Sequence, residues 1–385
     1  MKANPGGRIA PENVFGRDRL IETIWERLDQ QCVLINAERR IGKTSIINKM
    51  VASPPDKWFP IYQDLERIHS AADFASEVYH VVQQFLGKWK IVANAAQRIY
   101  EDHEFSSVKK KTKKPWKSLL VSSIEDLVNQ QTAQSLIMFW DEVPYMIDNI
   151  RKTDGEQVAA EVLDTLRSLR QQHPDLRMVF TGSIGLHHVL AGLHDAHIAT
   201  APVNDMFSVE VTPLAPADAE SLAQQLLQGE QLDSSNIEDA ATAIAVEADF
   251  FPFYIHHIVN GLKTDGLPAE PDHIEQLVAR HLVDANDPWE LAHFCTRIPI
   301  YYTSDNDAKL AHMILDGLAV DSQPRDVAAL LEEVRLKGIE FDDRENLLRV
   351  LRLMERDHYL SRTLEGEYEF RFPLIRRWWK LDRGL

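Results

Sequence analysis

The sequence is poor in cysteine and has no long apolar run. Two of its 385 residues are cysteines, Cys32 and Cys295, and they lie far apart, so no disulfide framework is indicated. Cys32 lies in an apolar stretch, where we expect a small buried side chain and a reducing, cytoplasmic setting. No segment approaches the ~18 consecutive apolar residues of a membrane span, and residues 1–7 lack the apolar core of a secretory signal. The sequence therefore predicts a cytoplasmic protein with no membrane partner.

Positive charge is also in short supply. The chain has 42 lysine and arginine residues against 59 aspartate and glutamate residues, which gives a formal net charge of −17. Because nucleic-acid phosphates bind positive surfaces, this balance argues against a protein that coats nucleic acid. One local basic patch is typical of a solvated surface insertion, with DNA contact as the alternative. The patch consists of Lys109, Lys110, Lys111, Lys113, Lys114 and Lys117.

The first half of the chain alternates short apolar runs with stretches of helical spacing. At roughly 100–200 residues per domain, the length predicts two or three domains. Strands are predicted at 32–35, 59–65, 136–140, 177–181 and 207–211. Helices are predicted at 19–28, 46–51, 71–86, 118–131 and 155–172. This alternation predicts an α/β fold with a parallel sheet that is covered on both faces.

Helical patterns dominate after Pro213. The stretch contains predicted helices at 217–228, 236–247, 252–263 and 271–284, which indicates an all-helical second domain. Three more helices are predicted at 307–318, 324–335 and 343–356, followed by a hairpin within 359–372 and a helix at 374–379. Three helices followed by a hairpin is the order of a winged helix. We therefore expect an α/β domain at 1–212, a helical lid domain at 213–286 and a winged-helix domain at 287–385.

The strongest motif follows the first predicted strand and opens a helix. It runs from Ala37 to Thr44 and matches the phosphate-loop pattern, except that alanine replaces the first glycine. Backbone N–H groups and a helix N-terminus at such a loop bind phosphate, and the lysine reaches the β- and γ-phosphates. A hydroxyl at the next position can bind Mg²⁺. The predicted nucleotide-binding residues here are Arg39, Arg40, Ile41, Gly42, Lys43, Thr44 and Ser45.

The second motif is the pair of carboxylates that ends an apolar strand, Asp141 and Glu142. Ligands bind at the carboxyl ends of strands in open parallel sheets. We expect Asp141 to hold Mg²⁺ together with Thr44, and Glu142 to act as the general base on the attacking water. The alternative for this acidic pair is a cap on the following helix.

Two further residues follow the next predicted strand. Thr181 and Ser183 could lie between the acidic strand and a γ-phosphate and detect hydrolysis. An ordinary turn with serine as the helix cap explains the same residues equally well.

Taken together, these motifs make the chain similar to the AAA+/STAND-type P-loop ATPases, especially the archaeal-ATPase-like group. Its residues 14–18, 37–44, 139–142, 181–183 and 251–254 carry the resemblance, with weaker family-like phrases at 211–214 and 370–379. The resemblance implies that Val14, Phe15, Gly16 and Arg17 line an adenine pocket. It also implies that Pro252 of the lid touches the adenine, although the glycine of the family motif is replaced by Phe250. An arginine finger would be needed for efficient hydrolysis in an oligomer; Arg167 and Arg170 are placed suitably, but nothing singles them out.

The resemblance predicts a nucleotide-driven switch that binds ATP or ADP with Mg²⁺ and hydrolyses ATP, slowly or with a partner. Its state would control assembly of a homo-oligomer or binding of a partner protein, and family analogy suggests prokaryotic signalling, mobile elements or antiviral defence. The alternative is a DNA-binding initiator or loader similar to origin-recognition ATPases, through the winged helix or the patch from Lys109 to Lys117. A third hypothesis is a non-enzymatic protein that keeps the same fold and uses ADP as a structural ligand.

Overall fold

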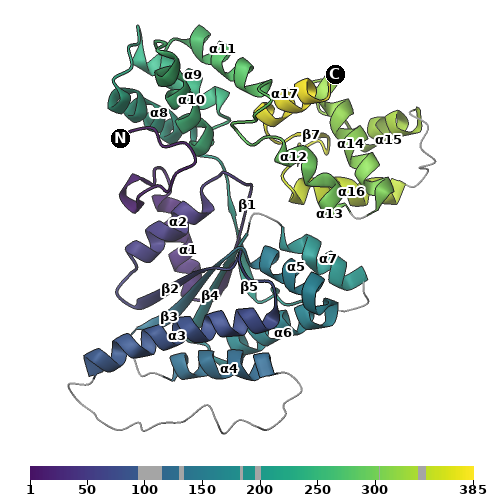
Figure 1. Cartoon of the computed structure of the whole chain (residues 1–385). Helices are drawn as coiled ribbons and strands as arrows, with labels where there is room; N and C mark the ends of the chain where they lie inside the picture. Colours follow the sequence, from purple (N-terminus) through teal and green to yellow (C-terminus); the bar gives the residue numbers. More distant parts are fainter. Residues whose placement is uncertain (94–114, 130–133, 183–184, 196–200, 303, 337–343) are drawn as a thin grey trace. The chain divides into compact units, whose positions relative to one another are not determined.

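The computed structural model describes residues 1–93, 115–129, 134–182, 185–195, 201–302, 304–336 and 344–385 (Figure 1). They form two compact units. The sheet unit comprises residues 21–36 and 50–210, and the C-terminal unit comprises residues 1–20, 37–49 and 211–385. The predicted phosphate loop therefore groups with the C-terminal half of the chain.

A five-stranded sheet lies at the centre of the sheet unit, in the order β2-β3-β4-β1-β5. Its three described pairings, β1 with β4, β2 with β3 and β3 with β4, are parallel. This confirms the predicted α/β fold with a parallel sheet. The strands are β1 (Cys32–Ala37), β2 (Trp58–Asp64), β3 (Ser135–Asp141), β4 (Leu176–Thr181) and β5 (Met206–Val211).

The strand β3, which lies between β2 and β4, is buried from Leu136 to Asp141, which explains its unbroken apolar sequence. Trp140 near its end stacks on Phe180 at 5.8 Å between ring centroids and meets Phe74 edge-on at 5.4 Å. The indole N–H of Trp140 donates to Gln63 Oε1 at 2.7 Å, so its polar atom is satisfied in the core. These contacts fix the end of β3, including its last residue, Asp141.

Helices pack on this sheet, and Figure 1 shows α3 and α4 side by side. The sequence predicts one helix at 155–172, and the structure adds α5 immediately before it. Pro144 lies in the first turn of α5, where a proline removes no helical hydrogen bond. Gly155 at φ 92° separates α5 from α6. The helices are α1 (Asp18–Leu28), α3 (Ala71–Ala93), α4 (Pro115–Val128), α5 (Val143–Asp154), α6 (Glu156–Gln172) and α7 (Leu186–Asp195).

The C-terminal unit begins with a short 3₁₀ helix, Pro11–Asn13, and includes the first turns of α2 (Lys43–Ala52). Four helices match the four predicted after Pro213: α8 (Pro216–Glu230), α9 (Ile237–Glu247), α10 (Pro252–Asp265) and α11 (Pro271–Leu282). The rest comprises α12 (His293–Thr296), α13 (Ile298–Tyr301), α14 (Asp305–Val320), α15 (Val327–Leu336), α16 (Arg344–Arg356), β6 (Leu360–Arg362), β7 (Tyr368–Phe370) and α17 (Pro373–Asp382). Three helices and an antiparallel hairpin thus occur in the predicted order, while the winged-helix assignment stays a prediction.

The turn between α9 and α10 is joined to α17. Asp249 accepts a hydrogen bond from the N–H of Leu374 at 2.6 Å, and Arg377 pairs with Glu247 at 2.6 Å. Burial raises the pKa of Asp249 to about 7. Within the part of the chain that the structure describes, no helix is both long and apolar enough to cross a membrane.

Candidate nucleotide-binding site

The predicted phosphate loop is a tight turn between the end of β1 and the start of α2. Gly42 has φ 101° and Arg40 has φ 67°, so two of its residues lie at positive φ. An added Cβ at Gly42 would meet no other atom within 4 Å, so the backbone conformation and not crowding demands glycine there. The carbonyl of Gly42 accepts from the N–H of Ile46 at 3.0 Å as α2 begins. The loop therefore leads into a helix N-terminus, where anions bind favourably.

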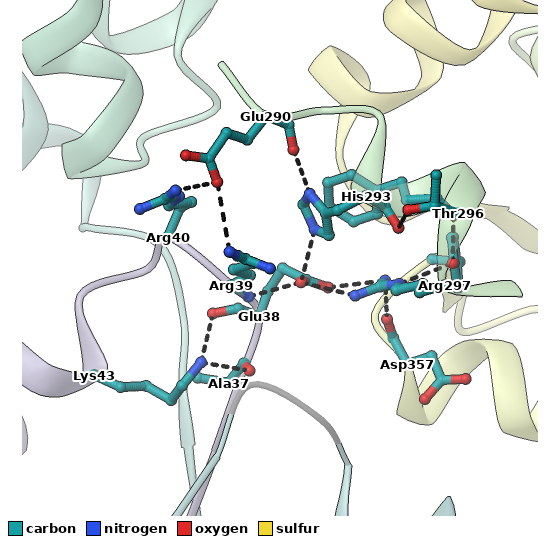
Figure 2. A network of polar contacts seen from close by, with 12 residues as sticks. Ala37, Glu38, Arg39, Arg40, Lys43, Glu290, His293, Thr296, Arg297 and Asp357 are labelled. Carbon is teal, nitrogen blue, oxygen red and sulfur yellow. Dashed lines mark hydrogen bonds and ion pairs between the residues drawn. The ribbon is translucent and has the colours of Figure 1, made fainter. Parts of the chain in front are cut away.

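Lys43 lies over the loop that precedes it. Its Nζ donates to the carbonyl of Ala37 at 3.2 Å and to that of Glu38 at 3.1 Å, and the side chain is buried (Figure 2). The next two residues, Thr44 and Ser45, lie in the first turn of α2, with Thr44 exposed and Ser45 half-buried. The lysine and the hydroxyls thus lie on the elements that the sequence predicts.

The predicted adenine segment is bound to the same loop. Arg17 is buried, and it donates to the carbonyl of Ile41 at 3.1 Å and to that of Thr212 at 2.8 Å. Burial lowers the pKa of Arg17 to about 10. Val14 is anchored through its carbonyl, which accepts from Lys49 Nζ at 3.1 Å. The structure therefore brings residues 14–18 to the phosphate loop.

Gly16 explains how closely this segment packs. It has φ 62°, and an added Cβ would lie 2.8 Å from the Cβ of Asp218 and 3.0 Å from Leu214. A side chain at this position would be strained and would collide with the start of α8. Phe15, beside it, is half-buried.

A residue at the start of α10 also contacts the loop. Pro252 starts α10, and the ring of its neighbour Phe253 lies 4.6 Å from the guanidinium carbon of Arg40. A cation over an aromatic face is attracted by the ring quadrupole. Contact of Pro252 itself with a nucleotide remains a prediction.

In the sheet unit, the predicted Mg²⁺ ligand Asp141 is held at the end of β3. Its Oδ1 accepts from the hydroxyl of Thr181 at 2.5 Å, and the hydroxyl of Tyr62 lies 3.5 Å from its Oδ2. Both Asp141 and Thr181 are buried. The sequence placed Thr181 near the acidic strand, and the structure shows that it orients the carboxylate directly.

Glu142 follows in an unusual conformation. It is the residue before α5, with φ 59° and ψ 34°, in the left-handed region that non-glycine residues seldom adopt. Its side chain is half-buried, and its N–H donates to Asp141 Oδ1 at 3.1 Å. Such strain persists only where the surroundings impose it, and it is concentrated at functional sites.

Other residues named from the sequence have different partners, are exposed or lie outside the described residues. Arg170 is buried and bound to Asp205 at 2.8 Å, and Arg167 donates to the carbonyl of Ala201 at 3.1 Å, so both have structural partners in the sheet unit. Lys117 is exposed on α4. Ser183 and the lysines from 109 to 114 lie outside the described residues.

Sequence reasoning missed four charged residues that surround the loop. Glu38 lies inside the motif but was given no role, and Arg297, His293 and Glu290 lie more than 250 residues away. Arg297 Nη1 lies 2.9 Å from Glu38 Oε1, and Nη2 lies 3.1 Å from Oε2, in a bidentate ion pair (Figure 2). An acidic residue in an otherwise basic loop was the only local signal, and it does not identify its partner.

Comparison with known proteins supports the fold. No family model matches the chain, and a search of curated proteins gives no match. Among solved structures, a Walker-type ATPase of Pyrococcus abyssi is 16% identical, with 98% of both chains covered and a TM-score of 0.67. The ORC2 protein of Aeropyrum pernix, in ADPNP–ADP complexes, is 9% identical over 96% of this chain and 95% of its own, with a TM-score of 0.53.

The sheet order, the loop after β1 and these likenesses define the fold. The chain has a P-loop NTPase fold of the AAA+ type.

Proposed function

We propose that this chain binds ATP and ADP with Mg²⁺ and hydrolyses ATP. The observation that carries the proposal is the loop between β1 and α2, in which Lys43 lies over the carbonyls of a positive-φ turn at a helix N-terminus. The two similar structures are those of a Walker-type ATPase and of an ORC2 protein in complexes with ADPNP and ADP, which is in line with this activity.

In this proposal the loop and the acidic pair act on the same nucleotide. The strands β1, β4 and β3 are consecutive neighbours and run parallel, so their carboxyl ends lie at one edge of the sheet. The phosphate loop follows β1 in the sequence, and Asp141 is the last residue of β3. We therefore assign the loop amides and Lys43 to the phosphates.

The residues also fit a magnesium ion. Mg²⁺ prefers oxygen ligands, and Thr44 offers a hydroxyl while Asp141 offers a carboxylate that is oriented by Thr181. When bound, the ion would neutralise charge on the transferred phosphoryl group. Glu142 is the general base in this proposal, since it is the neighbour of Asp141 in the chain. Its backbone conformation, at positive φ, sets the direction of its Cα–Cβ bond.

The finer role that we propose is a STAND-type switch. Loss of the γ-phosphate would change contacts at Lys43, Thr44 and Asp141, and such a change can order or release neighbouring elements. Contacts between the loop and residues 211–385 lie within one compact unit, which supports a readout through the C-terminal half. Assembly of a homo-oligomer or binding of a partner protein would be the output.

A DNA initiator or loader remains the alternative, because the ORC2 protein has a similar fold. The helix before the hairpin gives it limited support. Arg349 on α16 is paired with Asp307 at 2.5 Å, and the hairpin turn carries Leu364, Glu365 and Glu367, which are not phosphate-binding residues. A salt titration of duplex DNA binding separates the two roles: a steep salt dependence favours DNA loading, and no binding at low salt excludes it.

The test of the enzymatic proposal compares wild type with Lys43→Ala and Glu142→Gln, with Lys117→Ala as the matched lysine control. We expect Lys43→Ala to lose nucleotide binding. Glu142→Gln should retain bound MgATP while turnover falls by roughly 10²–10⁴-fold, the usual contribution of a general base. Lys117→Ala should behave like wild type, since Lys117 is exposed on α4. Wild-type turnover in both site variants would refute the assignment.

A further inference from the structure

Three of the four charged side chains of the phosphate loop meet opposite charges from one short segment, residues 290–297. Glu38 pairs with Arg297, Arg40 pairs with Glu290, and Arg39 lies 3.5 Å from the same Glu290 (Figure 2). Along residues 38–40 the order of signs is negative, positive, positive. Arg297 faces the negative side chain and Glu290 faces the two positive ones, so each of these three charges meets the opposite charge.

These pairs differ greatly in burial. The side chain of Glu38 is 2% exposed and that of Arg297 is 14% exposed, whereas Arg39 and Glu290 are nearly half exposed. Exposed pairs contribute little, and a buried bidentate pair is held strongly once it has formed. Burial alone would raise the pKa of Glu38, but Arg297, with His293 3.7 Å away, lowers it well below the usual range. Glu38 is therefore ionised in the folded chain.

Arg297 is itself held rigidly. Its Nε donates to the hydroxyl of Tyr359 at 2.8 Å and its Nη2 donates to the carbonyl of Asp357 at 2.7 Å. Its guanidinium carbon lies 4.3 Å from the ring centre of Tyr359 and 4.6 Å from that of Phe294. A guanidinium fixed by two hydrogen-bond acceptors and by two rings presents one geometry to Glu38.

The segment that carries these charges is held by Asp287, which precedes it in the chain. The carboxylate of Asp287 accepts from the N–H groups of Leu291 and Ala292, both at 2.8 Å. Asp287 and Glu290 both have positive φ, at 46° and 54°. Local hydrogen bonds hold this backbone at positive φ before it contacts the loop. The segment therefore loses little conformational entropy on contact.

Glu38 connects this segment to the lysine. Its side chain meets Arg297, its Oε1 accepts from the N–H of Arg39 at 2.6 Å, and its carbonyl accepts from Lys43 Nζ at 3.1 Å. A shift of Glu38 would therefore move one of the two carbonyls that hold Lys43, together with an amide of the loop. Conversely, phosphates that bind those groups must act on Glu38.

We propose that Arg297 and His293 are positioning residues of the nucleotide site, which hold Glu38 and thereby keep the phosphate loop and Lys43 in the conformation that receives phosphate. The proposal rests on nucleotide binding by the loop. It makes nucleotide affinity depend on residues 290–297, and by linkage it makes bound nucleotide stabilise the contact of that segment with the loop.

The test measures MgADP affinity of the full chain by calorimetry, at a temperature well below the unfolding midpoint of every variant. We expect Arg297→Met and Glu38→Gln each to weaken binding by about 5- to 150-fold, the usual range of coupling between sites. The double variant should be no weaker than the weaker single variant, because both remove one interaction. Arg377→Met, which breaks an ion pair with Glu247 in the same unit, should bind like wild type.

Other outcomes of these measurements would overturn the proposal. Wild-type affinity in Arg297→Met, or single effects that multiply in the double variant, would overturn the proposal. Tighter binding by Glu38→Gln would show that Arg297 acts on the phosphates directly, which also overturns it. If Arg297→Met does not fold, Glu38→Gln and His293→Gln decide the matter, since each keeps the guanidinium. If wild type binds no MgADP, the proposed function itself fails, and this inference fails with it.

Discussion

Replacing Arg297 with methionine should destabilise the C-terminal unit severely. The substitution preserves most of the side-chain length but leaves the Glu38 carboxylate, which is 2% exposed, without its cation. Removing one partner of a buried ion pair costs about 3–5 kcal/mol, because the remaining buried charge loses its main counterion and is not hydrated in exchange. At about 2–4 °C per kcal/mol for a unit of this size, the unfolding midpoint should fall by roughly 6–20 °C. The exposed Arg39 provides the control: Arg39→Met should cost no more than about 1 kcal/mol.

The pH dependence of this loss has a definite sign. In wild type the folded pKa of Glu38 lies below its unfolded value, so its contribution to stability is present above about pH 4.3 and is lost as the pH falls through the folded pKa. Without Arg297, burial raises the pKa of Glu38, and the carboxyl can take up a proton. The difference between wild type and Arg297→Met should therefore shrink between pH 7.5 and pH 5 in differential scanning fluorimetry.

Two results would refute this reasoning. A fall in the midpoint of less than about 2 °C at pH 7.5 would show that the ion pair contributes little, as for an exposed pair. A difference that stays constant or grows toward pH 5 would show that Glu38 is not the destabilising charge. The double variant Glu38→Gln/Arg297→Met should recover more than half of the loss, since it removes the unpaired carboxylate.

Two further predictions concern Asp141 and Asp249. Thr181→Val removes the hydroxyl that donates to Asp141 at 2.5 Å, and we expect MgATP turnover to fall by roughly 10–100-fold, the usual effect of removing an outer-shell partner of a metal ligand. Wild-type turnover at saturating Mg²⁺ would contradict this role. The folded pKa of Asp249 is about 7 and lies above its unfolded value, so its ionisation lowers stability as the pH rises from about 4 to 7. Asp249→Asn, whose amide oxygen can still accept from Leu374, should therefore raise the unfolding midpoint at pH 8 and not at pH 4; an equal midpoint at pH 8 would refute this.

The elements of the fold were predictable because their signals are local. Apolar runs bounded by turn residues identified all five strands, and the phosphate loop was recognisable from residues 37–44 alone. The helix α5 was missed because its segment mixes charged residues with Pro144, and a proline near a helix start can be mistaken for a turn.

The surroundings of the loop were not predictable in the same way. Glu38 and Arg297 are 259 residues apart, and only the folded chain brings them within 2.9 Å. The positive φ of Glu142 could not be predicted from the sequence either, because glutamate has no preference for positive φ. Thr181 was placed correctly near the acidic strand, since neighbouring parallel strands end at one edge, but its bond to Asp141 required the register of β3 and β4.

Equilibrium binding of MgATP tests the central claim most directly. In isothermal titration calorimetry, the wild-type chain should bind one MgATP per chain in a saturable reaction. Lys43→Ala should show no saturable binding at the same concentrations, because it removes the only side chain that donates to both Ala37 and Glu38 among the described contacts of the loop. The absence of binding by wild type, or equal binding by Lys43→Ala, would contradict the account.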